Sequence, residues 1–215
     1  METHSIRVRR TARYHVEGEL GGETQELWFL LHGYGERARD FLRSCSALQA
    51  PGRVLVAPEG LSRFYLRRGN GDVGASWMTK EAREEEIADY VDYLDRLRSE
   101  LQSSLSPSHT VGVLGFSQGT ATAARWALLG ERPVNKLILW GGSVPPDADL
   151  GSGRERLLEL DLTYVLGRAD SYIRPEDHER EEERMREAGI AHRTVWFDGG
   201  HAIEADVLGE LSANR

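Results

Sequence analysis

Short apolar runs alternate with longer amphipathic stretches from residue 26 onward. Six of the runs have the length and apolar content of buried strands: residues 27–33, 53–60, 110–116, 136–142, 162–167 and 193–200. Strands of this kind, separated by helical stretches, are typical of a parallel sheet that helices cover on both faces. The pattern therefore predicts an α/β fold with a mainly parallel central sheet.

Two amphipathic stretches predict the clearest helices. A helix from Pro175 to about Gly189 is rich in Glu and Arg, which predicts a solvated face with His178 at the surface. Ahead of the sheet, residues 6–20 alternate between polar and apolar and predict one or two exposed antiparallel strands at a sheet edge. In residues 80–102 apolar side chains recur at steps of three and four, so they share the helix face that packs on the sheet: Ile87, Tyr90, Val91, Leu94, Leu97 and Leu101.

The length and charge of the chain narrow the classes of function. With 215 residues, we expect a single domain over residues 1–215. The formal net charge of −8 gives no basic surface for nucleic acid and would be repelled by anionic lipid. No apolar run approaches the ~20 residues that span a bilayer, and the basic first residues lack the apolar core of a signal peptide. These features predict a cytoplasmic protein without stable membrane insertion.

The single cysteine, Cys45, excludes an internal disulfide and a thiolate metal cage. We expect Cys45 to be a small buried apolar residue with no chemical role. Four classes remain at this stage: a hydrolase, a nucleotide-binding module, a carboxylate-metal enzyme and a non-catalytic binding protein.

One short motif separates these classes. Residues 115–119, Gly-Phe-Ser-Gln-Gly, match the G-x-S-x-G pattern of a nucleophile elbow, although the pattern alone is weak. A predicted strand precedes the motif and a helix rich in small residues follows it, which is the strand–turn–helix that strains the serine backbone. The glycine spacing of a phosphate-binding loop is absent. Ser117 is therefore the candidate nucleophile.

A serine nucleophile needs a histidine base and a carboxylate that orients it, in the chain order Ser, Asp or Glu, His for this architecture. His201 follows the last predicted strand, whereas His178 and His192 are expected at the surface. Asp170, in the loop after the preceding strand, is the candidate acid. Its rival is Asp198, three residues before His201, whose other interpretation is a turn-forming residue.

Acyl transfer also requires donors for the oxyanion. One should be the backbone N–H of Gln118, directly after the nucleophile and at a helix N-terminus. The other should come from the glycine-rich loop 32–35, most simply the N–H of Tyr34. We expect His32 to brace this loop rather than to take part in catalysis, because His201 already supplies the base.

At these residues the sequence resembles the phospholipase/carboxylesterase family of α/β-hydrolases, which includes bacterial carboxylesterases and acyl-protein thioesterases. The matching segments, in the family's order, are LHGYGERARDF, APEG, ASWM, GFSQGTATA, GRADSYIRP and GGHAI. The resemblance implies a minimal α/β-hydrolase fold with no cap domain. It also implies a role for each site residue: Ser117, Asp170 and His201 as the triad, Tyr34 and Gln118 as oxyanion donors, and Trp77 in the acyl pocket.

The chain departs from the family at two places. Leu166 stands where the family usually has a non-catalytic His, and Gly141-Gly142-Ser143-Val144 stands where it usually has Ser-Gly and an apolar residue. The second segment borders the acyl pocket, so it bears on substrate choice.

The connection from Glu59 to Thr79 is about 20 residues without a regular period, a length at which loops are usually functional or disordered. One interpretation is an acyl or aromatic binding site with a basic rim, and the other is a loop whose aromatic residues pack on the sheet. The connection after Trp140 is too short for a lid, which predicts an open cleft. The binding candidates are Phe64, Tyr65, Trp77 and Met78, beside Leu66, and the rim would be Arg63, Arg67 and Arg68.

The leading hypothesis is a serine hydrolase that cleaves carboxylic esters, or else thioesters or lysophospholipids, through an acyl-enzyme, with no cofactor and no metal. The alternatives are a non-catalytic ligand-binding protein on the same fold and a hydrolase of peptides or lactones. A small acyl ester is the expected partner and nucleic acid is not. The acyl chain length and the oligomeric state, including a homodimer, stay open.

Overall fold

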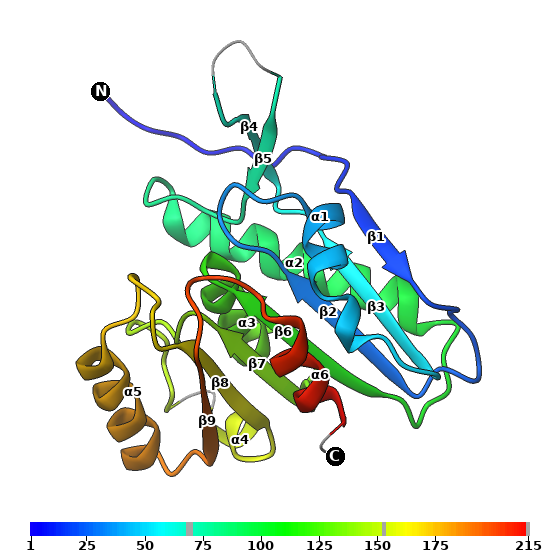
Figure 1. Cartoon of the computed structure of the whole chain (residues 1–215). Coiled ribbons are helices and arrows are strands. Elements are labelled where there is room, and N and C mark those ends of the chain that lie inside the picture. Colours follow the sequence, from blue (N-terminus) through cyan, green and yellow to red (C-terminus); the bar gives the residue numbers. More distant parts are fainter. Residues whose placement is uncertain (68–70, 152–153, 214–215) are drawn as a thin grey trace.

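A seven-stranded sheet forms the centre of the computed structural model, which describes residues 1–67, 71–151 and 154–213 (Figure 1). Its strand order is β1-β3-β2-β6-β7-β8-β9, with β1 antiparallel to β3 and the other neighbours parallel. The six predicted strands and the antiparallel edge strand are confirmed. The bounds are Tyr14–Glu17 (β1), Glu26–Leu31 (β2), Arg53–Pro58 (β3), Thr110–Phe116 (β6), Lys136–Trp140 (β7), Asp161–Gly167 (β8) and His192–Phe197 (β9).

Helices cover both faces of this sheet, as the alternating pattern predicts. One face packs on α2 and α3, and the other on α1 and α6, each over its own apolar core. The periodic face of the long helix is confirmed, since Tyr90, Leu94, Leu97 and Leu101 are buried. The helices are Ala38–Ser44 (α1), Arg83–Gln102 (α2), Gln118–Leu129 (α3), Arg154–Leu158 (α4), Pro175–Glu187 (α5) and Ala205–Ala213 (α6), with a 3₁₀ turn at Ser46–Leu48 (η1).

Two expectations are wrong. The connection 59–79 is not irregular but holds an antiparallel hairpin, β4 (Ser62–Tyr65) and β5 (Val73–Ser76), which projects from the molecule beside the N-terminal segment. His178 is buried rather than exposed, because its ring packs on Tyr164 of β8 and its Nε2 lies 3.0 Å from Thr194 Oγ1 of β9. A helix rich in charge can still bury one stripe, and the strands beneath decide which residues it contains.

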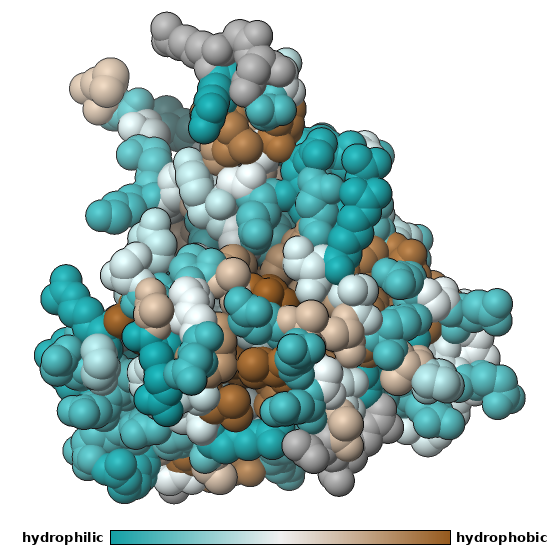
Figure 2. Space-filling model, in the orientation of Figure 1, coloured by the Kyte–Doolittle hydropathy of each residue, from teal (hydrophilic) through white to brown (hydrophobic). Residues whose placement is uncertain are grey.

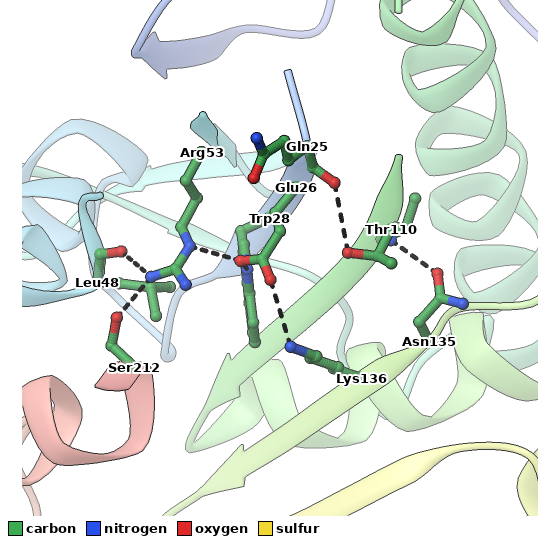
Figure 3. Close-up of polar contacts among 10 residues, drawn as sticks. Gln25, Glu26, Trp28, Leu48, Arg53, Thr110, Asn135, Lys136 and Ser212 are labelled. Carbon is green, nitrogen blue, oxygen red and sulfur yellow. Dashed lines mark hydrogen bonds and ion pairs between the residues drawn. The ribbon is translucent and has the colours of Figure 1, made fainter. Parts of the chain in front are cut away.

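The amino ends of the parallel strands are joined by a charged network that Figure 3 shows. The Glu26 carboxylate accepts hydrogen bonds from Arg53 Nε (2.7 Å) and Trp28 Nε1 (3.1 Å), and Lys136 Nζ lies 3.3 Å away. Arg53 also donates to the Ser212 hydroxyl of α6 (2.5 Å). This network ties β2, β3, β7 and the last helix together at the edge of the sheet opposite the loops described next.

Candidate active site

The candidate residues follow the carboxyl ends of parallel strands, so they meet at one edge of the sheet. Ser117 comes directly after β6, Asp170 follows β8, and His201 follows β9. The loop 32–36, which follows β2, reaches the same edge because β2 pairs with β6. Residues more than 160 positions apart in the chain are thereby gathered by the strand order alone.

Ser117 has the strained backbone that a nucleophile elbow requires. Its φ is 53°, and Ser117 and Ala82 are the two non-glycine residues with positive φ in the described part of the chain. The turn is tight because a methyl group on Gly115 would overlap the Gly119 carbonyl, and one on Gly119 would overlap the Leu31 carbonyl. Such strain persists only where the surroundings impose it, and it projects the serine side chain from the turn.

Asp170 and His201 form the pair that the sequence places on neighbouring loops. Asp170 Oδ2 lies 2.6 Å from His201 Nδ1, and the aspartate side chain is 1% exposed. Its second oxygen accepts the Tyr172 N–H at 2.8 Å, so both carboxylate oxygens are in use. Asp198, the rival, is 95% exposed and lies 3.5 Å from Arg168 Nε. The geometry therefore favours Asp170 as the residue that orients His201.

The ring of His201 contacts two aromatic side chains. Its centroid is 4.8 Å from that of Phe116, which directly precedes Ser117, and 4.7 Å from that of Tyr172. Among the described residues no hydrogen bond joins the Ser117 hydroxyl to His201. Catalytic hydrogen bonds are often long without substrate and tighten in the reacting complex. A contact between Ser117 and His201 therefore stays a prediction for the complex with substrate.

The loop 32–36, named the oxyanion loop here for its expected role, has backbone N–H groups with different partners. Gly33 N–H donates to the Glu36 carboxylate (2.7 Å) and Gly35 N–H donates to the Ala75 carbonyl (2.8 Å). In the hydrogen bonds between described residues, the N–H groups of Tyr34 and Gln118 have no acceptor. These are the two amides that the sequence analysis selects as oxyanion donors, and both are free to bind a ligand oxygen.

A family comparison decides the class of the protein. The model of the family described as Serine hydrolase (FSH1) matches residues 28–205, which include the elbow, the acid loop and the histidine loop. The chain belongs to this serine hydrolase family. It is therefore an enzyme, and the non-catalytic binding protein among the alternatives is set aside. A comparison with curated protein sequences gives no match.

Solved structures show that this serine hydrolase has the α/β-hydrolase fold. Acyl-protein thioesterase 2 of Zea mays superposes with a TM-score of 0.70 at 19% identity, covering 94% of this chain and 96% of that one. The Bacillus cereus carboxylesterase gives a TM-score of 0.69 at 16% identity, covering 94% and 92%. Esterase PE8 gives a TM-score of 0.68 at 22% identity, covering 95% of this chain and 97% of that one. At these identities the likeness concerns the fold alone.

Two further features of this serine hydrolase agree with that fold. Between β7 and β8, the described residues contain α4 and loops, with no inserted cap domain. None of the helices in the ranges that the structure covers is both long and apolar enough to cross a membrane.

His32 braces the oxyanion loop of the hydrolase, as the sequence analysis expects. The imidazole is fully buried, its Nε2 accepts the Gly60 N–H (3.0 Å), and its Nδ1 lies 2.7 Å from the Gly33 carbonyl oxygen. Burial lowers the pKa of His32, which keeps the ring neutral. His32 therefore fixes the loop from behind and does not face the candidate site.

Trp77 lies behind the oxyanion loop and is only 2% exposed. Its indole N–H donates to the His32 carbonyl (2.8 Å), and its backbone N–H donates to the Gln118 side chain (3.1 Å). The Gln118 amide in turn donates to the Met78 carbonyl (2.8 Å). These contacts make Trp77 a brace between the hairpin and the elbow, whereas its place in an acyl pocket stays a prediction.

The other binding candidates differ in exposure. Phe64 is half-buried and its ring contacts that of Tyr34 at a tilt of 31°, with centroids 5.1 Å apart, while Tyr65 is exposed. Met78 is half-buried, and Leu66 is exposed. Figure 2 shows hydrophobic surface on this hairpin within mostly hydrophilic surroundings. The hairpin thus brings apolar side chains next to the oxyanion loop through Tyr34.

The predicted basic rim is only partly described. Arg63 and Arg67 are exposed, and Arg63 lies 3.8 Å from Glu59, whereas Arg68 lies outside the described residues. Arg63 is therefore engaged by a carboxylate of its own segment, and a basic rim stays a prediction.

One side chain near the site, Tyr172, escapes the sequence analysis. Its ring contacts the His201 ring, and its position two residues after Asp170, whose carboxylate accepts the Tyr172 N–H, is the signal for it. The pair Gly141-Gly142, which the sequence analysis places at the border of the acyl pocket, lies against other site residues: a methyl group on Gly141, whose φ is +66°, would lie 3.1 Å from His201 Cε1, and one on Gly142 would overlap the Thr120 hydroxyl. The departure from the resembled family thus lets the loop after β7 pass close to His201.

Proposed function

We propose that this serine hydrolase cleaves carboxylic esters through an acyl-enzyme on Ser117. His201 removes the proton from the serine hydroxyl and returns it to the leaving group, and Asp170 holds the imidazole in the required tautomer. The N–H groups of Tyr34 and Gln118 stabilise the tetrahedral oxyanion. The observation that carries the proposal is the buried Asp170–His201 pair at the edge of the sheet where Ser117 is strained outward.

Each step of this mechanism has a defined proton balance. Attack of Ser117 Oγ on the ester carbonyl carbon breaks the carbonyl π bond and places the charge on the oxygen. Collapse of that adduct expels the alcohol, which receives the proton that His201 took from the serine. Water then repeats the sequence on the acyl-enzyme, releasing the acid and restoring the hydroxyl. The described residues contain no cluster of metal-ligating side chains, and the proposed chemistry needs none.

The substrate in this proposal is a small ester, and its acyl part lies toward the hairpin. Phe64, Tyr65 and Met78 supply apolar surface there, with Tyr34 between the hairpin and the oxyanion donors. The sequence further predicts a cytoplasmic location and leaves a homodimer open. Thioester, lysophospholipid, lactone and amide cleavage are outcomes that the substrate panel described next separates, because the triad serves every acyl transfer.

Replacement of Ser117 by Ala tests the mechanism. We expect labelling by a fluorophosphonate to disappear and kcat for a p-nitrophenyl ester to fall by about 10⁴- to 10⁶-fold, with the fold retained. The exposed Ser104→Ala is the matched control and should label and turn over like the wild type. A Ser117→Ala enzyme within tenfold of wild type would refute the nucleophile. A panel of esters, thioesters, lysophospholipids, lactones and amides on the wild type then tests the ester preference.

A further inference from the structure

Glu36 closes the turn that carries the Tyr34 amide. Its carboxylate accepts the Gly33 N–H at 2.7 Å, its own N–H donates to the Gly33 carbonyl at 3.3 Å, and its carbonyl accepts the Ala75 N–H at 3.1 Å. A Glu that reaches back three residues to a backbone N–H has the spacing of one half of a capping box. One residue therefore makes three of the hydrogen bonds that define the turn 33–36.

The Glu36 carboxylate also lies close to the nucleophile. A methyl group placed on Gly33 would be 3.0 Å from Glu36 Oε2, 3.1 Å from a ring carbon of Phe116 and 3.3 Å from Ser117 Cβ. The side chain thus reaches the point where the oxyanion loop, the end of β6 and the elbow converge. Among the described residues, the carboxylate accepts the Gly33 N–H and not the Tyr34 N–H.

The surroundings of Glu36 do not explain it as a structural ion pair. Within the described part of the chain, no Lys or Arg pairs with this half-buried carboxylate, since the neighbouring Arg37 is paired with Asp40. Burial raises the pKa of Glu36, and the Gly33 hydrogen bond and nearby His201 partly oppose that rise. Burying a carboxylate without a counter-charge costs stability, and the Gly33 hydrogen bond offsets only part of that cost.

We propose that Glu36 is a positioning residue: by accepting the Gly33 N–H it holds the turn 33–36 in the conformation that directs the Tyr34 N–H at the oxyanion. The inference rests on the proposed ester hydrolysis. Glu36 is not placed in contact with the substrate and acts through the backbone of residues 33 to 35. The oxyanion bond strengthens as the tetrahedral adduct forms, so a misdirected Tyr34 amide lowers kcat and leaves KM nearly unchanged.

Two substitutions of Glu36 by side chains of similar length distinguish the effect of the hydrogen bond from that of the charge. Glu36→Gln keeps an acceptor oxygen for the Gly33 N–H, whereas Glu36→Met fills the same space with none. We expect the Met variant to lose about 10- to 100-fold in kcat with KM within about threefold, below the full loss seen on deleting an oxyanion donor. The Gln variant should stay within about fivefold of wild type, because its amide oxygen replaces the carboxylate as acceptor. Glu100→Met, the same substitution at an exposed carboxylate of α2, should leave kcat unchanged.

The rates are divided by the fraction of enzyme that a fluorophosphonate labels at end point, which corrects for any unfolded protein. A Met variant with the kcat of wild type, or a Gln variant as slow as the Met variant, overturns the proposal. If Glu36→Met does not fold, the Gln variant decides alone, since a loss above about thirtyfold there shows that the charge and not the acceptor matters. A wild type that neither labels nor hydrolyses esters contradicts the proposed function instead, so the two failures are distinguishable.

Discussion

Asp170 and Asp198 lie on loops beside the same histidine, but their surroundings differ completely. Asp170 has both carboxylate oxygens in hydrogen bonds and almost no exposed surface, whereas Asp198 is open to water near Arg168. A carboxylate orients a histidine only when it is itself fixed, because a mobile and solvated side chain holds no single tautomer. The difference in burial therefore favours Asp170 over Asp198 as the residue that orients His201.

Asparagine substitutions of the two aspartates should give very different enzymes. We expect Asp170→Asn to lower kcat by about 10³- to 10⁴-fold, because the amide stabilises the wrong tautomer of His201 and cannot stabilise the imidazolium. Asp198→Asn should change kcat by less than about threefold, as expected for an exposed side chain that contacts no reacting group. Steady-state kinetics of both purified variants on one ester measures this. A greater loss in Asp198→Asn would show that the acid is assigned to the wrong residue.

At the scale of residues, the sequence indicates the candidate catalytic positions more readily than the packing around each side chain. Ser117, Asp170 and His201 can be proposed because motif, chain order and strand ends restrict them to a few positions. The burial of Trp77 and His178 is a different matter, since it depends on partners from other elements, such as His32 in the loop after β2 and Tyr164 in β8. Glu36 leaves a local signal, the three-residue spacing to Gly33, but such spacing gains meaning only when the turn is known to carry Tyr34.

At the scale of elements, the elbow depends on how closely the α3 N-terminus approaches β2. Gly119 lies against the Leu31 carbonyl, and Gly115 lies against Gly119 itself, so β6, the turn and α3 pack backbone to backbone. A side chain there would have to displace main chain, which is much less adaptable than a side chain. The motif glycines are therefore required by packing and not only by the conformation of the serine.

Two glycine-to-alanine changes test this packing. Gly119→Ala should lower the free energy of unfolding by about 3 kcal/mol or more, because its methyl group overlaps the Leu31 backbone. Gly209→Ala, in α6, meets nothing within 4 Å and should raise it by about 0.5–1 kcal/mol, since Ala is the better helix former. Denaturant unfolding of both variants is the measurement. Equal free energies of unfolding for the two variants would contradict the close approach of Gly119 to the Leu31 carbonyl.

The strands were predictable as elements, but the hairpin was not, for a physical reason. Strands such as β2 and β3 are mostly apolar because helices cover both faces of the sheet and bury every residue of these strands. The sequences of β4 and β5, SRFY and VGAS, are short; β4 is partly exposed, and β5 is buried but consists mostly of small residues, so neither strand has the apolar run that marks a buried strand. They form because they pair with each other, and Gly35 N–H and Ala75 carbonyl connect β5 to the oxyanion loop.

At the scale of the whole molecule, the carboxyl ends and the amino ends of the parallel strands differ in the groups that they carry. The carboxyl ends carry strained and half-exposed groups, whereas the amino ends carry the buried Glu26 network that joins three strands and α6. Burial alone would raise the pKa of Glu26, but the hydrogen bonds from Trp28 and Arg53 and the charges of Arg53 and Lys136 lower it. The carboxylate therefore stabilises the fold where it is ionised.

Glu26→Gln should lower the free energy of unfolding at neutral pH by roughly 3–5 kcal/mol, because it leaves Arg53 buried without its counter-charge. A lowered folded pKa means that this contribution is complete above the unfolded pKa and is lost as pH falls through the folded value. The difference in the free energy of unfolding between wild type and variant should therefore narrow below about pH 4.5. Unfolding curves at several pH values measure it, with the exposed Glu100→Gln as control. A gap that stays constant with pH would contradict the ionised network.

At the carboxyl ends of the strands, the described residues between β7 and β8 form no cap, and the hairpin stands beside the oxyanion loop. We expect soluble short-chain esters to be hydrolysed with simple saturation, because no cover has to move before the substrate reaches Ser117. The measurement is a series of p-nitrophenyl esters from acetate to decanoate, each followed below and above the concentration at which it reaches its solubility limit. A jump in rate at that concentration would reveal a mobile cover, for which the projecting β4–β5 hairpin would be the first segment to test.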